Sequence, residues 1–113
     1  MSIKIFLDDG RNPDDFYTFE GQEFVTVRTV KEFKDILSGV SQVDLISFDH
    51  DLGHTDPEST GYEALCWVEE RAFLGELEVG EIGVHTANMG AARKMWQAAK
   101  KITENVFRPS SKY

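Results

Sequence analysis

The sequence contains one cysteine and has no long apolar run. Cys66 cannot form an intrachain disulfide, and its place in an apolar helical stretch predicts a small buried hydrophobe rather than a nucleophile. No run reaches the roughly 18 apolar residues that a membrane span requires, and the first residues lack the pattern of a secretory leader. We therefore expect a protein without a membrane partner, in the cytoplasm of a bacterium or, if viral, of an infected host cell.

Basic residues are also few, with 12 lysines and arginines against 20 acidic residues and a net charge of −8. This balance repels polyanions and argues against general DNA binding. Residues 93–113 are the exception, because they contain six basic side chains and one acidic side chain. This part therefore carries a charge of +5 and the rest of the chain a charge of −13. A solvated basic helix face is one interpretation; attraction for a phosphate held at an acidic metal site is the other.

The patterns of apolar residues predict a single α/β domain over residues 1–113, with an ordinary hydrophobic content of 41%. Strands are expected at 2–7, 23–28, 43–48, 81–86 and 105–109, and helices from 29 to about 39, from 60 to about 75, and over 88–102. Strands that alternate with helices in this way predict a five-stranded parallel sheet wound on both faces. Residues 10–22 show no pattern of apolar residues that predicts a helix or a strand.

Several large side chains of the helices are expected to pack inward. Met89 and Trp96 share the apolar face of the third helix. We interpret Trp67, Trp96 and Phe73 as helix–sheet packing rather than as a platform for stacking a base.

Polar residues follow four of the predicted strands directly. They are Asp8 and Asp9, then Asp49 and His50, then His85 and Thr86, and finally Arg108. Parallel strands bring their carboxyl ends to one rim, where open α/β sheets bind ligands. The sequence therefore predicts a site there.

Three carboxylates at one rim would repel one another unless a divalent cation neutralised them. Mg²⁺ prefers oxygen ligands and is favoured, with Mn²⁺ as a possibility. A transition metal bound partly by His50 or His54 is the alternative, although their spacing is a weak zinc signature.

Each polar group also has a purely structural interpretation. Asp8 and Asp9 could end a strand and begin a turn. His85 could be a core histidine with its hydrogen bonds satisfied, and Asn88 is well placed as the N-cap of the third helix. Four such strand ends together favour a site more than any one of them does.

The segments FLDD, SFD, HTA and FRP resemble receiver domains of two-component signalling. In those domains an acidic pair binds Mg²⁺, a third aspartate accepts a phosphoryl group, a Ser or Thr contacts that group, and a Lys before Pro pairs with it. By position, Asp8, Asp9, Asp49, Thr86 and Arg108 take these roles, with Arg in place of Lys. The resemblance implies a flavodoxin-like receiver fold with a degenerate first helix and without the last helix.

The longer segments FLDDGRNP, ISFDHDLG, TGYE and HTANMGAARKM are more specifically similar to the cyclic-phosphate-processing receiver-like family, over nearly the whole chain. This resemblance implies a metal-dependent phosphoesterase acting on nucleotides or nucleic-acid ends that carry a cyclic phosphate.

The same resemblance implies roles for individual residues. The three aspartates would hold the metal, and His50 and His85 would be the general base and acid or phosphate ligands. Arg11 would steady the phosphate and Asp51 would orient a histidine. The phosphate-binding set is completed by Thr86, Asn88 and Arg108, and His54 is a supporting candidate.

Two other functions remain open. The first is a receiver-like signalling or nucleotide-binding module that is phosphorylated on Asp49, or binds metal there, without hydrolysis. The second is a small viral or mobile-element protein that sequesters or degrades a host nucleotide signal.

Overall fold

The computed structural model describes residues 3–113, which form a five-stranded sheet in the order β2-β1-β3-β4-β5. All neighbouring strands are parallel, as predicted. The strands are β1 (Lys4–Leu7), β2 (Val25–Val27), β3 (Gln42–Phe48), β4 (Glu78–Val84) and β5 (Val106–Phe107). The strand order reverses between β1 and β3, which is where ligands bind in sheets of this kind.

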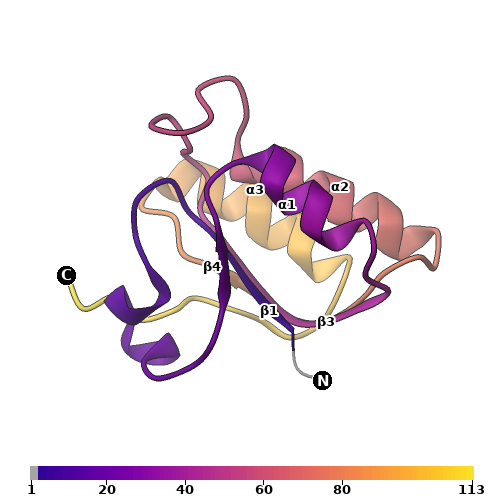
Figure 1. The fold of residues 1–113 in the computed structure, drawn as a ribbon, viewed down its shortest axis with the longest axis horizontal. Coiled ribbons are helices and arrows are strands. Elements are labelled where there is room, and N and C mark those ends of the chain that lie inside the picture. Colours follow the sequence, from indigo (N-terminus) through magenta and orange to yellow (C-terminus); the bar gives the residue numbers. More distant parts are fainter. Residues whose placement is uncertain (1–2) are drawn as a thin grey trace.

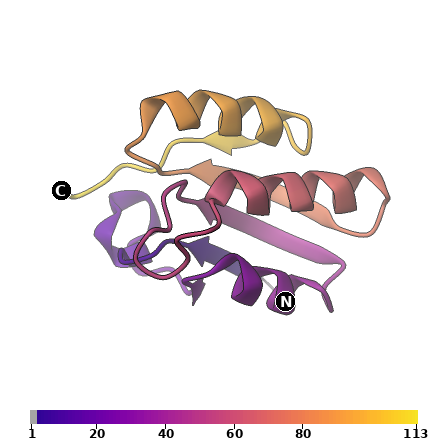
Figure 2. The same cartoon turned by 90° about the horizontal axis from the view of Figure 1, so that it is seen from above.

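Three α-helices cover one face of the sheet, side by side (Figures 1 and 2). They are α1 (Val30–Leu37), α2 (Gly61–Phe73) and α3 (Met89–Lys100). The predicted caps are confirmed, because the side chains of Thr29, Thr60 and Asn88 each accept a backbone hydrogen bond from the first turn of their helix. The helix boundaries could thus be predicted from local sequence.

The opposite face is covered by two 3₁₀ turns, η1 (Pro13–Asp15) and η2 (Tyr17–Phe19), instead of a helix (Figure 1). Phe16, between the two turns, and Phe19 of η2 are buried and pack against Phe6 of β1, with ring centroids 5.8 and 6.2 Å away. The tail after β5 joins this layer, since the N–H of Tyr17 donates to the carbonyl of Ser110. This segment is the degenerate first helix that the sequence predicts.

Three predictions of buried side chains are wrong. Cys66 is exposed, because Ala64, Leu65 and Val68 take the inward positions of α2. Phe73 is 88% exposed and Met89 57% exposed. These two residues are the last of α2 and the first of α3, where no further helical turn covers them.

Trp67 and Trp96 are half-buried, so neither is a full core residue. In the part of the chain that the structure describes, every helix is too short or too polar to cross a membrane.

Candidate functional site

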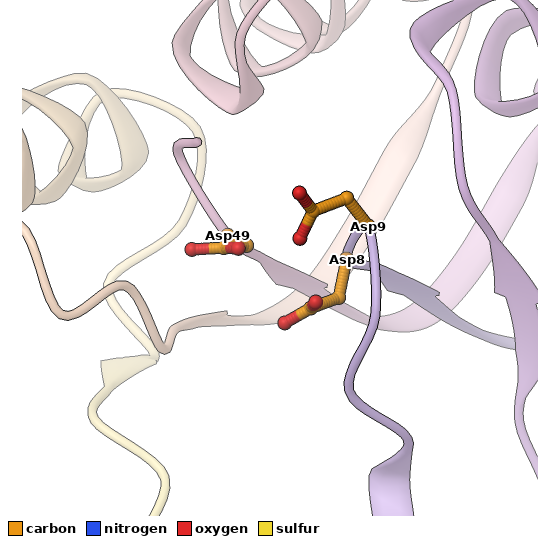
Figure 3. A group of neighbouring side chains, drawn as sticks. All are labelled: Asp8, Asp9 and Asp49. Carbon is orange, nitrogen blue, oxygen red and sulfur yellow. The ribbon is translucent and has the colours of Figure 1, made fainter. Parts of the chain in front are cut away.

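Three carboxylates lie together at the switch point of the sheet. Asp8 and Asp9 follow β1 and Asp49 follows β3, and one oxygen from each lies within 4.8 Å of the others (Figure 3). Within residues 3–113 this is the one group of three or more acidic, histidine or cysteine side chains placed in this way. We call it the acid group, and its oxygen donors suit a hard divalent cation.

Asp8 is the most constrained member of the acid group and is 1% exposed. Its Oδ1 accepts hydrogen bonds from the backbone N–H groups of Gly10 (2.9 Å) and Arg11 (2.8 Å). Its Oδ2 accepts one from Arg11 Nε (3.0 Å) and lies 3.1 Å from His85 Nε2. Burial alone would raise the pKa of Asp8, but His85 and the backbone donors hold it well below its usual range. Asp8 is therefore ionised.

Asp49 has the opposite electrostatic environment. It is 6% exposed, and burial, followed by the charge of Asp8, raises its pKa from the ordinary 3.8 to about 6. Arg11, the backbone N–H of His50 and the hydroxyl of Thr86 oppose this shift only in part. The acid group thus holds more negative charge than its surroundings neutralise, which is what a cation site requires before the ion binds.

His85 lies beneath the acid group, and its side chain has no exposed surface. Its ring stacks on Phe6 at 4.5 Å and meets the edge of Phe16 at 5.1 Å. Burial lowers the pKa of His85 although Asp8 opposes this, so the ring is neutral. Since ionised Asp8 only accepts, Nε2 carries the proton, and the Ser47 hydroxyl donates to Nδ1 at 2.6 Å.

This burial does not fit the role of general acid, base or phosphate ligand that the resemblance implies for His85. The ring is enclosed by Phe6, Phe16 and Ser47 and reaches Asp8 alone in the acid group. Its contacts are those expected of a core histidine with satisfied hydrogen bonds, and His85 also positions a carboxylate of the site.

Replacing Ser47 with alanine is expected to destabilise the protein by about 1–3 kcal/mol, because Nδ1 of His85 loses its buried donor. Ser38→Ala is the matched control, since the exposed Ser38 hydroxyl donates to the Lys34 carbonyl at a helix end. Urea denaturation of both variants measures the difference. Equal, small changes in the two would show that the Ser47–His85 hydrogen bond contributes nothing.

His50 is partly accessible to solvent, with a side chain 22% exposed. Its Nδ1 lies 2.7 Å from Asp51 Oδ1, so Asp51 is in position to orient the ring and leave Nε2 for another partner. His54 is exposed, and only its backbone N–H contacts the acid group, donating to Asp9 Oδ2 at 3.1 Å. Neither imidazole joins the acid group within the described residues, which disfavours the transition-metal alternative.

A cleft of about 320 Å³ opens beside the acid group and is lined by Arg11, Thr86 and Arg108, together with the tail after β5. We call it the arginine cleft. Arg11 also pairs with the acids, with Nη2 3.5 Å from Asp49 Oδ1. Two guanidinium groups on one cleft favour a phosphate or another anion. Asn88 does not line this cleft; its backbone N–H donates to Thr86 Oγ1 at 3.1 Å, and its side chain caps α3 by accepting from the N–H of Ala91.

Arg28 is a residue of the site that the sequence did not single out. Its Nη1 donates to the carbonyls of Asp8 (3.1 Å) and Arg11 (2.6 Å), and its Nη2 to Asn12 Oδ1 (2.6 Å). It therefore fixes the loop that presents Asp8 and Asp9. Its place directly after β2, at the same rim as the other polar strand ends, is the signal that could have found it.

The parallel sheet, its order and the acids at the ends of β1 and β3 define a receiver-like α/β domain. A family model described as the cyclic-phosphate processing receiver domain matches residues 3–101, so the chain belongs to this family. No curated protein and no solved structure matches the chain significantly.

Proposed function

We propose that the protein is a metal-dependent phosphoesterase that opens a cyclic phosphate on a nucleotide or nucleic-acid end. The observation that carries the proposal is the acid group, in which Asp49 has a raised pKa and lies 3.5 Å from Arg11, one of two arginines that line the neighbouring cleft. Membership of a cyclic-phosphate-processing family supports the choice of substrate.

Asp8, Asp9 and Asp49 would hold Mg²⁺, or Mn²⁺ in its place. Three carboxylate oxygens within 4.8 Å, supplemented by water and a substrate phosphate, are the ligands that such ions prefer. When bound, the cation would neutralise the acid group and stabilise charge on the non-bridging phosphate oxygens. His85 and Arg28 would keep Asp8 and its loop in place for this purpose.

His50 is the proposed general base. Asp51 accepts a hydrogen bond from the Nδ1–H group, so Nε2 is left to take a proton from a water molecule. The water oxygen forms a new bond to phosphorus, one ester bond of the ring breaks, and the released ribose oxygen takes a proton from solvent. The product is a phosphomonoester, and Arg11 and Arg108 would bind its additional charge.

Replacing His50 with alanine is expected to lower kcat by roughly 10²–10⁴-fold, the usual contribution of a general base. His54→Ala is the matched comparison and should leave kcat near the wild-type value, since the imidazole of His54 is exposed and only its backbone contacts Asp9. The measurement is turnover, with Mg²⁺ or Mn²⁺, of a panel of 2′,3′-cyclic, 3′,5′-cyclic and ADP-ribose cyclic phosphates. Full activity of His50→Ala would remove His50 from the mechanism.

One contact favours a second candidate function, a receiver-like module phosphorylated on Asp49. The hydroxyl of Thr86 acts to lower the pKa of Asp49, so it lies where the phosphoryl-contacting residue of a receiver would lie. Incubation with acetyl phosphate distinguishes the two functions. An acyl phosphate that forms on wild type but not on Asp49→Asn, without turnover of any cyclic phosphate, would establish the module and exclude the esterase.

A further inference from the structure

A second cavity, of about 190 Å³, lies between α3 and the end of β4. Its lining is mainly apolar and comes from Val84, Met89, Ala92 and Trp96, with Thr86 and Arg108 at its border. We call it the α3 pocket. Met89 is 57% exposed there and Trp96 is half-buried, so the two side chains present apolar surface that the fold itself does not cover.

The α3 pocket adjoins the arginine cleft, because Thr86 and Arg108 line both cavities. Thr86 also lies near the acid group, since its hydroxyl acts to lower the pKa of Asp49. Arg108 Nη1 lies 3.8 Å from Met89 Sδ, so the guanidinium group lies at the border between the cavities. A ligand that occupied both cavities would lie across Arg108.

The lining of the α3 pocket suits a flat heteroaromatic ring. A tryptophan and a methionine supply polarisable surface for stacking, which typically contributes about 1–3 kcal/mol for each base. Arg93 joins Arg108 at the pocket, so two cations lie near it on a chain of net charge −8. This combination favours an aromatic group that is attached to a phosphate.

We propose that the α3 pocket binds the base of a single nucleotide whose phosphate lies in the arginine cleft. The position of the phosphate rests on the proposed function; the base contact rests on the pocket. A longer nucleic acid is disfavoured, because the chain outside residues 93–113 carries a charge of −13 and would repel further phosphates. Trp96 and Met89 would then contact the base, contrary to the interpretation of Trp96 as packing alone.

The test compares adenosine 3′-monophosphate with ribose 3-phosphate, which lacks the base, by calorimetry in the presence of Mg²⁺. The nucleotide is expected to bind roughly tenfold more tightly or better, the value of one modest stacking contact. Ala92→Phe fills the pocket and should abolish this difference. Gln97→Phe adds the same ring to an exposed position of α3 and should preserve it.

Met89→Ala provides a second variant in case Ala92→Phe does not fold, because the exposed Met89 can be truncated without opening the core. It should weaken binding of the nucleotide but not of ribose 3-phosphate. Equal affinity of wild type for the two ligands would overturn the proposal. Tighter binding of a 3′-phosphorylated oligonucleotide than of the mononucleotide would overturn the restriction to a single nucleotide.

If the proposed function is wrong but the base contact is correct, the binding experiments would give a different result. In that case Ala92→Phe would still weaken nucleotide binding, but neither Mg²⁺ nor Asp49→Asn would change the affinity for either ligand. Loss of the base contact alone would leave the effects of Mg²⁺ and Asp49→Asn intact. The two proposals can thus be rejected separately.

Discussion

Asp49→Asn is expected to stabilise the metal-free protein while it abolishes stabilisation by Mg²⁺. Burial and the neighbouring Asp8 raise the pKa of Asp49 from 3.8 to about 6, so the ionised carboxylate destabilises the folded state at neutral pH. Asparagine has nearly the same shape without the charge. The expected gain in the free energy of unfolding is about 1–3 kcal/mol, since one pKa unit corresponds to about 1.4 kcal/mol.

The gain in the free energy of unfolding caused by Asp49→Asn should be larger at high pH than at low pH. Because the folded-state pKa of Asp49 lies above its unfolded value, the penalty is fully present above about pH 6 and disappears as the pH falls from there toward 3.8. Urea denaturation in EDTA should therefore show a large difference between variant and wild type well above pH 6, and a small one near the lower end of that window. A difference that does not change with pH would show that Asp49 carries no charge penalty.

Saturating Mg²⁺ should remove or reverse the difference in stability between Asp49→Asn and wild type. A ligand at a hundred times its Kd stabilises the folded state by about 2.7 kcal/mol, and only wild type keeps the complete acid group. Asp51→Asn is the matched control, because Asp51 is a neighbouring acid that lies outside the acid group. Equal stabilisation of wild type and Asp49→Asn by Mg²⁺ would contradict the metal site.

Gly61→Ala is expected to destabilise the protein by more than about 3 kcal/mol and to disrupt the acid group. Gly61 begins α2 and packs against the backbone that carries Asp49 and His50. A Cβ atom there would lie 1.5 Å from the Asp49 carbonyl oxygen, so the chain would have to move. The hydrogen bond from the Gly61 N–H to the His50 carbonyl, at 2.9 Å, would be lost with it.

Gly53→Ala is the control for this prediction, since an added Cβ at Gly53, in the loop that precedes α2, would meet no atom within 4 Å. Thermal denaturation and Mg²⁺ titration of the two variants provide the comparison. A Gly61→Ala variant with wild-type stability and metal affinity would mean that α2 does not hold the Asp49 backbone in place.

The parts of the fold that depend on local sequence could be predicted. Thr29 and Thr60, each followed three residues later by glutamate, specify helix starts because the capping contacts are local. Asp8 and Asp49 end apolar strands, and a parallel sheet brings such ends together whatever the details of packing. The position of the acid group could therefore be predicted from the sequence alone.

The environment of each site residue could not be predicted, because it depends on contacts between distant segments. His85 is enclosed by Phe16, which comes from a stretch without apolar periodicity, and by Ser47 on another strand. The α3 pocket likewise arises where Arg108, after β5, meets α3. Residue types alone do not show which histidine is enclosed and which is accessible.

The most direct test of the central claim follows a nucleoside 2′,3′-cyclic phosphate by phosphorus NMR in the presence of purified protein and Mg²⁺. We predict that the cyclic resonance is replaced by that of one phosphomonoester, that EDTA stops the reaction, and that Asp49→Asn and His50→Ala lack it. A protein that binds Mg²⁺ through the acid group yet leaves this and every other cyclic phosphate of the panel unchanged would contradict the assignment as a phosphoesterase.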